Sequence, residues 1–401
     1  MTDITSKPQN KTKEFLTSLL ISFAFLFNSI CLLVNILIPS VENFGEIFVV
    51  AILLLGIGAC AISSIKINYS LLRINVILLL AMLGSFLYYE NDDAIKTLLT
   101  NFFVWGIGIT ILMMQEYSME KVLSISFKVS IIVMIFDIIT NADENYDSMV
   151  WAYAVLPCIA VTIVHFVYIR FTGLLSKIAY IPGFLMLIKF VLNANRGGLI
   201  SLAVLVILLN FKTKDKSNNK LKNKYLLGTL LIILFVILIV FIEQITLYLY
   251  DTLASYGVEV SAIKKMYRLI EADNVSNNRE ELYNFAWNGF LSSPVFGNGI
   301  GGFSVNHGGW AHNLILQLLY EGGVILTALI LVPLIKSSVF ILKSTIVTVE
   351  EYAMYIVLFS TSIPRLLFST ELWNTQAFWM LFALCILIGS KYKNKKRGRT
   401  L

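Results

Sequence analysis

Four side chains in the second half of the chain combine types that suit phosphate binding and proton transfer. Three are arginines: Arg196 in NANRGG and Arg365 in SIPRLL, which stand at the ends of apolar stretches, and Arg279 in NNREEL. A guanidinium carries a rigid fork of N–H donors that binds phosphate oxygens two at a time. The fourth is His312, whose imidazole, with an ordinary pKa of about 6.5, suits a general base near neutral pH. Together they predict chemistry on an anionic substrate.

A polar stripe follows His312 in an otherwise apolar stretch. Asn313, Gln317 and Glu321 recur every four residues, which places them on one face of a helix. Glu321 then lies about 12 Å along the helix axis from Asn313. A carboxylate at that depth needs a partner, so we expect Glu321 to fix packing through hydrogen bonds between helices or an arginine pair, rather than to act directly in catalysis.

The glycines of GNGIGGFSVNHGGWAHN have the spacing of a dinucleotide fingerprint, but their context excludes that function. The fingerprint needs a preceding strand and a following helix, whereas these glycines follow a helical pattern and precede an apolar span. We expect them to form a tight loop with positive φ that approaches another surface. His307 and His312 have no further ligands nearby, and all four cysteines lie in apolar stretches, so no metal site is predicted.

Composition defines the class of protein that must position these residues. The chain is 57% hydrophobic and 14% charged, with a mean hydropathy of +0.78, whereas soluble domains carry about 25% charged residues. Apolar stretches near the roughly 20 residues that span a bilayer recur along it. Because these stretches are continuous rather than alternating, an all-α polytopic membrane protein is predicted, and a β-barrel is not.

We predict about twelve transmembrane helices, with the seventh and eighth as an alternative broken or re-entrant pair. Residues 1–242 then hold helices 1–9, residues 243–312 form one large extracytoplasmic loop with amphipathic helices, and residues 313–401 hold helices 10–12 and a basic tail. The predicted spans are 15–38, 44–65, 71–89, 98–114, 122–139, 150–171, 174–192, 198–211, 225–242, 313–335, 351–368 and 373–390.

The distribution of lysine and arginine predicts the orientation. Placing both termini in the cytoplasm puts the lysine-rich segment 212–224 and the tail KYKNKKRGR inside, and leaves neutral or acidic loops such as ENDDAIK outside. The net charge of +6 follows from topology and requires no nucleic-acid partner. Arg196, Arg279 and Arg365 then stand on the outer side against the usual bias, where an anion is expected to meet them.

Two helices are predicted inside the large loop. SAIKKMYRLIEAD has an apolar face and a basic face, which is typical of a helix at the membrane interface. NNREELYNFAWNGFLSSP starts with Asn277 or Asn278 as the N-cap and ends at Pro294, so Arg279 stands at a helix start.

Three segments of the chain resemble the bacterial O-antigen polymerase and O-antigen ligase superfamily. These are NRGGLIS, NNREELYNFAWNGFLSSPVFGNGIGGF and AHNLILQLLYEGG, over about residues 185 to 335. The family's pattern falls on Arg196 with Gly197, Arg279, Pro294 with Gly297 and Gly299, His312 with Asn313, and Glu321 with Gly323. Many relatives carry a hydroxyl residue just before the first arginine, where this chain has Asn195.

The resemblance implies a GT-C-like membrane glycosyltransferase in the inner membrane of a bacterium, with its site on the extracytoplasmic side. Its donor is an undecaprenyl-pyrophosphate-linked oligosaccharide, its acceptor a glycan, and no cofactor is needed. The arginines would bind the pyrophosphate, with Asn313 and Glu321 also near the substrate. His312 would act as base; alternatives are a nearby carboxylate or late loss of the proton.

Three functions remain open from the sequence. A polymerase joins lipid-linked repeat units of O-antigen or capsule and is the preferred hypothesis. A chain-length regulator protein is then a candidate partner. A ligase transfers the finished glycan to lipid A core. A flippase belongs to another class and predicts repeated halves or charges along a central pathway, which the sequence lacks.

Overall fold

The computed structural model describes residues 8–38, 44–62, 67–90, 92–141, 146–169, 177–193, 196–211, 242–257, 261–271 and 279–396. Helices are the regular structure throughout these ranges. The predicted span 225–242, the lysine-rich segment, Asn195 and the predicted N-cap residues 277 and 278 lie outside the described residues, apart from Ile242.

The helices of the first half, up to the described residue 211, run as follows: α1 Pro8–Phe25, α2 Phe27–Leu37, α3 Phe44–Ile62, α4 Tyr69–Tyr88, α5 Asp93–Asn101, η1 Phe102–Gly108, α6 Ile109–Met113, α7 Met119–Thr140, α8 Ser148–Val164, η3 His165–Ile169, α10 Ile181–Asn193 and α11 Arg196–Leu209. The second half holds α13 Ile242–Ser255, α14 Ser261–Glu271, α15 Arg279–Ser292, α16 Gly302–His307, α17 Leu314–Lys343, α18 Val349–Phe368 and α19 Gln376–Lys396.

Five of the described helices are long and apolar enough to cross a membrane: Tyr69–Tyr88, Asp93–Met113, Met119–Thr140, Ser148–Ile169 and Leu314–Lys343. A sixth candidate is the pair α1 and α2, which is bent by 77° where a single span was predicted. α10 and α11 are apolar but only 13 and 14 residues long. A helical membrane protein is therefore confirmed, whereas the count of twelve spans stays a prediction.

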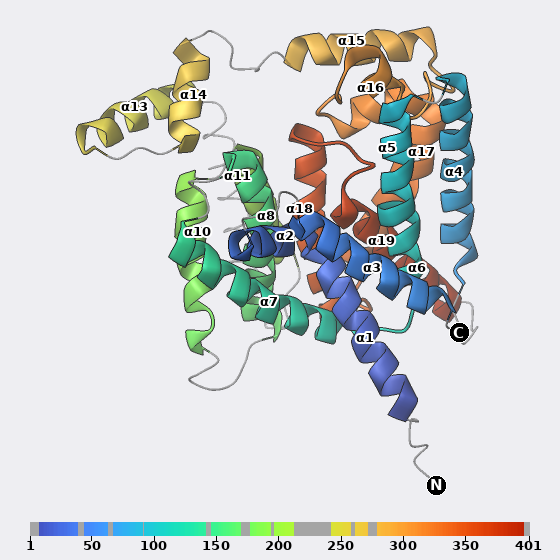
Figure 1. Cartoon of the computed structure of the whole chain (residues 1–401), viewed down its shortest axis with the longest axis horizontal. Helices are drawn as coiled ribbons and strands as arrows, with labels where there is room; N and C mark the ends of the chain where they lie inside the picture. The colour runs from blue at the N-terminus through green and yellow to red at the C-terminus, as the bar shows by residue number, and fades with distance from the viewer. Residues whose placement is uncertain are drawn as a thin grey trace.

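The core lies where α8, α18 and α19 pack together. Trp151 of α8, Tyr352 of α18 and Trp379 of α19 are all almost completely buried. Helices that are apolar on every side belong in the interior of a bundle. α4, in contrast, lies at one edge beside α5 and α17 (Figure 1) and exposes apolar side chains such as Leu80 and Leu87.

The extracytoplasmic segment of the prediction contains the expected helices. α15 starts at Arg279 and ends at Ser292, before Pro294, as its pattern indicates. α15 and α16 lie across one end of α17, while α13 and α14 extend to the opposite side of the view (Figure 1). Tyr250 of α13 and Tyr267 of α14 stack with ring centroids 3.9 Å apart.

The glycine-rich turn after α15 packs into a break in α17. Gly323 has φ 58° and ψ −155°, which interrupts the helix. The N–H of Val324 donates to the carbonyl of Pro294 (2.9 Å), and the N–H of Asn298 donates to the carbonyl of Tyr320 (2.8 Å). The turn thus satisfies backbone groups that the break would leave unpaired.

Only glycine fits at the point where this turn comes closest to α17. Gly297 has φ 69°, and a Cβ there would lie 2.4 Å from the backbone nitrogen of Gly322. The predicted turn with positive φ against another surface is confirmed, and that surface is α17.

Candidate functional site

The C-terminal end of α18 is the point where the predicted site residues meet. Arg279, the first residue of α15, donates from Nη2 to the carbonyl of Phe368 at 2.7 Å. Phe368 is the last residue of α18, and carbonyls at a helix end lack partners within the helix. This bond fixes the start of the loop helix to α18.

Arg196 is placed near the end of α18 because its neighbour Gly197 packs there. A Cβ on Gly197 would lie 2.1 Å from the Tyr153 hydroxyl and 3.0 Å from the Ser369 hydroxyl. Those two hydroxyls are hydrogen-bonded to each other at 2.7 Å. The absence of a side chain therefore lets α11 begin against α8 and the residue that follows α18. Arg196 is close enough to Arg279 for the two positive charges to act on each other.

His312 lies between α16 and α17 and also faces Ser369. Its Nδ1 accepts a hydrogen bond from the indole N–H of Trp310 at 3.1 Å. Because an indole only donates, Nδ1 holds the lone pair and the neutral ring carries its proton on Nε2. Burial and the charge of Arg279 lower the pKa of His312, while a hydrogen bond with the Ser369 backbone raises it. The ring is thus a neutral base whose lone pair is occupied by Trp310.

The backbone of His312 is held in an unusual conformation. Its φ of 51° lies in the left-handed region, which is uncommon for residues other than glycine. Such conformations persist where the surrounding structure fixes them, and they are frequent at functional sites.

Arg365 lies one turn before the end of α18. Its guanidinium carbon is 4.8 Å from the centroid of the Tyr153 ring, a cation–π contact. Its Nε is buried and has no hydrogen-bond partner within the described residues. Within those residues neither Arg365 nor Arg279 forms an ion pair, so the end of α18 carries an excess of positive charge that an anion would balance.

Asn313 and Glu321 make contacts of their own. The Asn313 side chain caps α17 by accepting from the N–H groups of Ile315 (3.0 Å) and Leu316 (3.2 Å). The carboxylate of Glu321 accepts from Gln317 Nε2 (3.1 Å) and from Trp373 Nε1 (2.9 Å). Its partners are therefore a helix neighbour and the loop after α18, as expected for packing between elements, and no arginine within the described ranges forms an ion pair with it.

Residues that the sequence did not single out complete the site. Tyr153, Trp310 and Ser369 contact the predicted residues directly, as described above. Glu371, in the loop after α18, is 3% exposed, and burial together with the charge of Glu321 raises its pKa to about 8. Its carboxyl stands beside Glu321, Gln317 and Asn374. No spacing rule marks these residues, because they come from three separate segments: α8, the stretch before α17 and the loop after α18.

The described helices define a helical membrane protein, and its predicted arginines gather at the C-terminal end of α18. Residues 181–331 match the family model of the O-antigen ligases, which confirms the resemblance found in the motifs. The match implies a membrane function of the O-antigen ligase or polymerase type, in the processing of glycans. It includes Arg196, Arg279 and His312 but ends before α18, whose C-terminal end joins them. No curated protein matches the chain.

Proposed function

We propose that this protein is a polymerase of undecaprenyl-pyrophosphate-linked oligosaccharide repeat units. It would build O-antigen or capsule at the outer face of a bacterial cytoplasmic membrane, with both termini in the cytoplasm and a GT-C-like arrangement of about twelve spans. The observation that supports this most directly is the convergence of Arg196, Arg279, Arg365 and His312 on the end of α18.

The chemistry assigned to these residues is a glycosyl transfer. The hydroxyl oxygen of the acceptor sugar forms a bond to the anomeric carbon of the donor, and the bond from that carbon to the diphosphate oxygen breaks. The electron pair of the broken bond stays on the diphosphate, where Arg196, Arg279 and Arg365 would stabilise the developing charge. The hydroxyl proton passes to Nδ1 of His312 once Trp310 releases it.

A ligase is the second candidate, because the matching family model is described as O-antigen ligase. The two functions share the donor and differ in the acceptor. Deletion of the gene separates them: a single repeat unit on lipid A core indicates a polymerase, whereas long chains left on undecaprenyl pyrophosphate indicate a ligase. Accumulation of repeat units on the cytoplasmic leaflet alone would instead indicate a flippase.

The site itself is tested by complementing the deletion with Arg196→Ala, Arg279→Ala and His312→Ala. Each variant is expected to insert in the membrane at wild-type levels and to reduce glycan chain growth by about a hundredfold or more. Arg268→Ala is the matched control, because Arg268 lies on α14, away from the cluster, and its side chain is exposed. Normal long-chain glycan from the first three variants would contradict the proposed function.

A further inference from the structure

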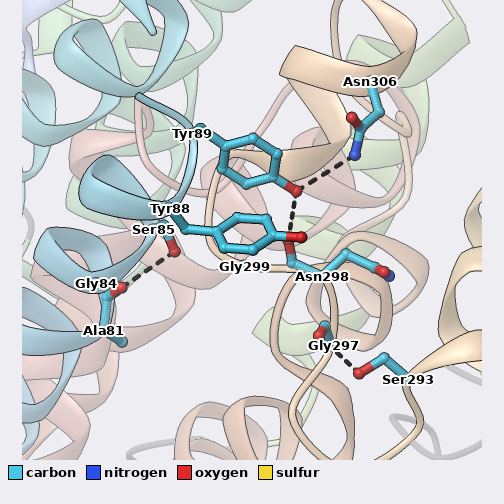
Figure 2. A pocket seen from close by; sticks show the side chains of 10 residues that line it. All are labelled: Ala81, Gly84, Ser85, Tyr88, Tyr89, Ser293, Gly297, Asn298, Gly299 and Asn306. Carbon is cyan, nitrogen blue, oxygen red and sulfur yellow. Dashed lines mark hydrogen bonds between the residues drawn. The ribbon is translucent and has the colours of Figure 1, made fainter. Parts of the chain in front are cut away.

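A cavity that the arginines and His312 do not line lies between the end of α4 and the turn and helix that follow α15. Its volume is about 580 Å³, within the range of small-molecule sites. Figure 2 shows that Tyr88, the last residue of α4, and Tyr89, which follows it, project toward Asn298, Gly299 and Asn306. Asn306 belongs to α16 and precedes His312 by six residues. One short segment of the chain therefore carries both a residue that lines the cavity and the candidate base.

The chemistry of the walls favours an uncharged ligand rich in hydroxyl groups. None of the described residues that line the cavity carries a charge; they are alanine, glycines, serines, tyrosines and asparagines. Amides and hydroxyls both donate and accept, which suits the hydroxyl groups of a sugar. A phosphate would instead require cations.

An aromatic surface is open to such a ligand. The Tyr88 side chain is 76% exposed, and its ring meets that of Tyr89 edge to face at 4.9 Å. The Tyr89 hydroxyl donates to the carbonyl of Asn298 (2.5 Å) and accepts from Asn306 Nδ2 (3.3 Å). These bonds hold Tyr89 in place and leave the Tyr88 ring free to pack against the apolar face of a sugar ring.

The cavity continues into a narrower apolar groove between α4 and α17. The two share Ala81, Ser85 and Gly299, and the groove of about 190 Å³ is lined by apolar side chains such as Ile77 and Leu329. Glu321 also lines the groove, but both of its oxygens are bound to Gln317 and Trp373. Because the groove offers few polar partners, a saccharide would stay in the upper cavity.

From this arrangement we infer that the cavity is a saccharide subsite, which holds uncharged sugar residues of the glycan away from the reacting diphosphate. The inference rests on the proposed function for the identity of the glycan. It assigns Tyr88, Asn298 and Asn306 to glycan binding, a role that the cationic cluster does not supply.

Binding of free saccharide by the full-length protein in lipid nanodiscs tests the inference. The probe is the oligosaccharide repeat unit released from its lipid, and titration measures its dissociation constant. Tyr88→Ala is expected to weaken binding by about fivefold, because the aromatic contact is lost. Arg279→Ala is expected to bind the oligosaccharide as tightly as the wild type. Unchanged affinity in Tyr88→Ala, or equal loss in Arg279→Ala, would overturn the subsite.

Photo-cross-linking in cells gives a second measurement that does not depend on activity. A benzophenone amino acid replaces Tyr88 in one variant and Leu87 in the other; both side chains are about three-quarters exposed, and only Tyr88 lines the cavity. Both variants also carry Arg279→Ala. The adduct formed at position 88 is expected to stain for carbohydrate, and the adduct formed at position 87 is expected to contain lipid alone. A carbohydrate-free adduct at 88 would overturn the subsite, whereas long-chain glycan from the Arg279→Ala strain would contradict only the proposed function.

Discussion

Arg279 Nη2 lies 2.7 Å from the carbonyl oxygen of Phe368, although 89 residues separate the two along the chain. The contact joins the first residue of a loop helix to the last residue of a core helix. Ser369, the next residue, contacts Tyr153, and His312 also interacts with its backbone. A short stretch at the end of α18 thus organises groups from four other segments, and the following predictions test that arrangement.

The titration of His312 is expected to depend on Arg279. The positive charge of Arg279 lowers the pKa of His312, so Arg279→Gln should raise it toward the ordinary value of about 6.5. The chain has three histidines, so NMR of protein labelled at the histidine rings resolves each titration. Arg268→Gln serves as the control and should leave all three unchanged. An unmoved His312 curve in Arg279→Gln would contradict the proximity of the two groups.

Glu371 is expected to make the protein less stable as pH rises. Its pKa is about 8 in the folded protein against an ordinary 4.5, so between these values the folded state keeps a proton that the unfolded state releases. Stability should then fall by up to about 1.4 kcal/mol per pH unit and level off above pH 8. Melting temperature in detergent from pH 5 to 9 measures this. Glu371→Gln should flatten the profile, and an equally steep profile in that variant would exclude Glu371 as its source.

Gly197→Ala is expected to destabilise the site through contact with Tyr153. The new Cβ would lie 2.1 Å from the Tyr153 hydroxyl, and overpacking of this kind costs about 1–3 kcal/mol. Tyr153→Phe removes the clashing oxygen, so the double variant should recover part of the loss in melting temperature. Gly84→Ala is the matched control, since nothing lies within 4 Å of a Cβ there. Additive effects of the two site substitutions would contradict the contact.

Glu321→Ala is expected to leave two buried donors unsatisfied. Trp373 Nε1 and Gln317 Nε2 both lose their acceptor, which costs about 1–3 kcal/mol for each buried group left unpaired. Glu321→Gln keeps one acceptor oxygen and should lose less. The melting temperatures of Glu321→Ala, Trp373→Phe and the variant that combines the two give the coupling energy between these residues. Glu321→Gln is measured beside them. Independence of Glu321 and Trp373 in that cycle would exclude their hydrogen bond.

Local patterns predicted much of the helical structure. The apolar runs 71–89, 122–139 and 150–171 correspond to α4, α7 and the helical stretch from α8 into η3, with ends that differ by one to three residues. Pro294 predicted the end of α15 correctly, because helix ends follow local chemistry, whereas the predicted N-cap residues lie outside the described residues. The bend between α1 and α2 has no proline or glycine at the break and could not be seen in the sequence.

The candidate site was predictable only in its charged members. Arg196, Arg279 and His312 stand out because charges are rare near apolar spans. Tyr153 and Ser369 do not, since their contact joins residues 216 positions apart and neither type is unusual in a helix. Trp310, which occupies the lone pair of His312, is one of six tryptophans and has no signature of its own.

The break in α17 at Gly323 has a mechanical consequence for the turn that packs into it. The Pro294 to Asn298 turn is bonded to both sides of the break, to the carbonyl of Tyr320 before Gly323 and to the N–H groups of Val324 and Ile325 beyond it. The turn therefore holds the two parts of α17 together. A tilt of the helix beyond Gly323, such as a change in bilayer thickness would cause, is thus expected to move the Pro294 to Asn298 turn with it.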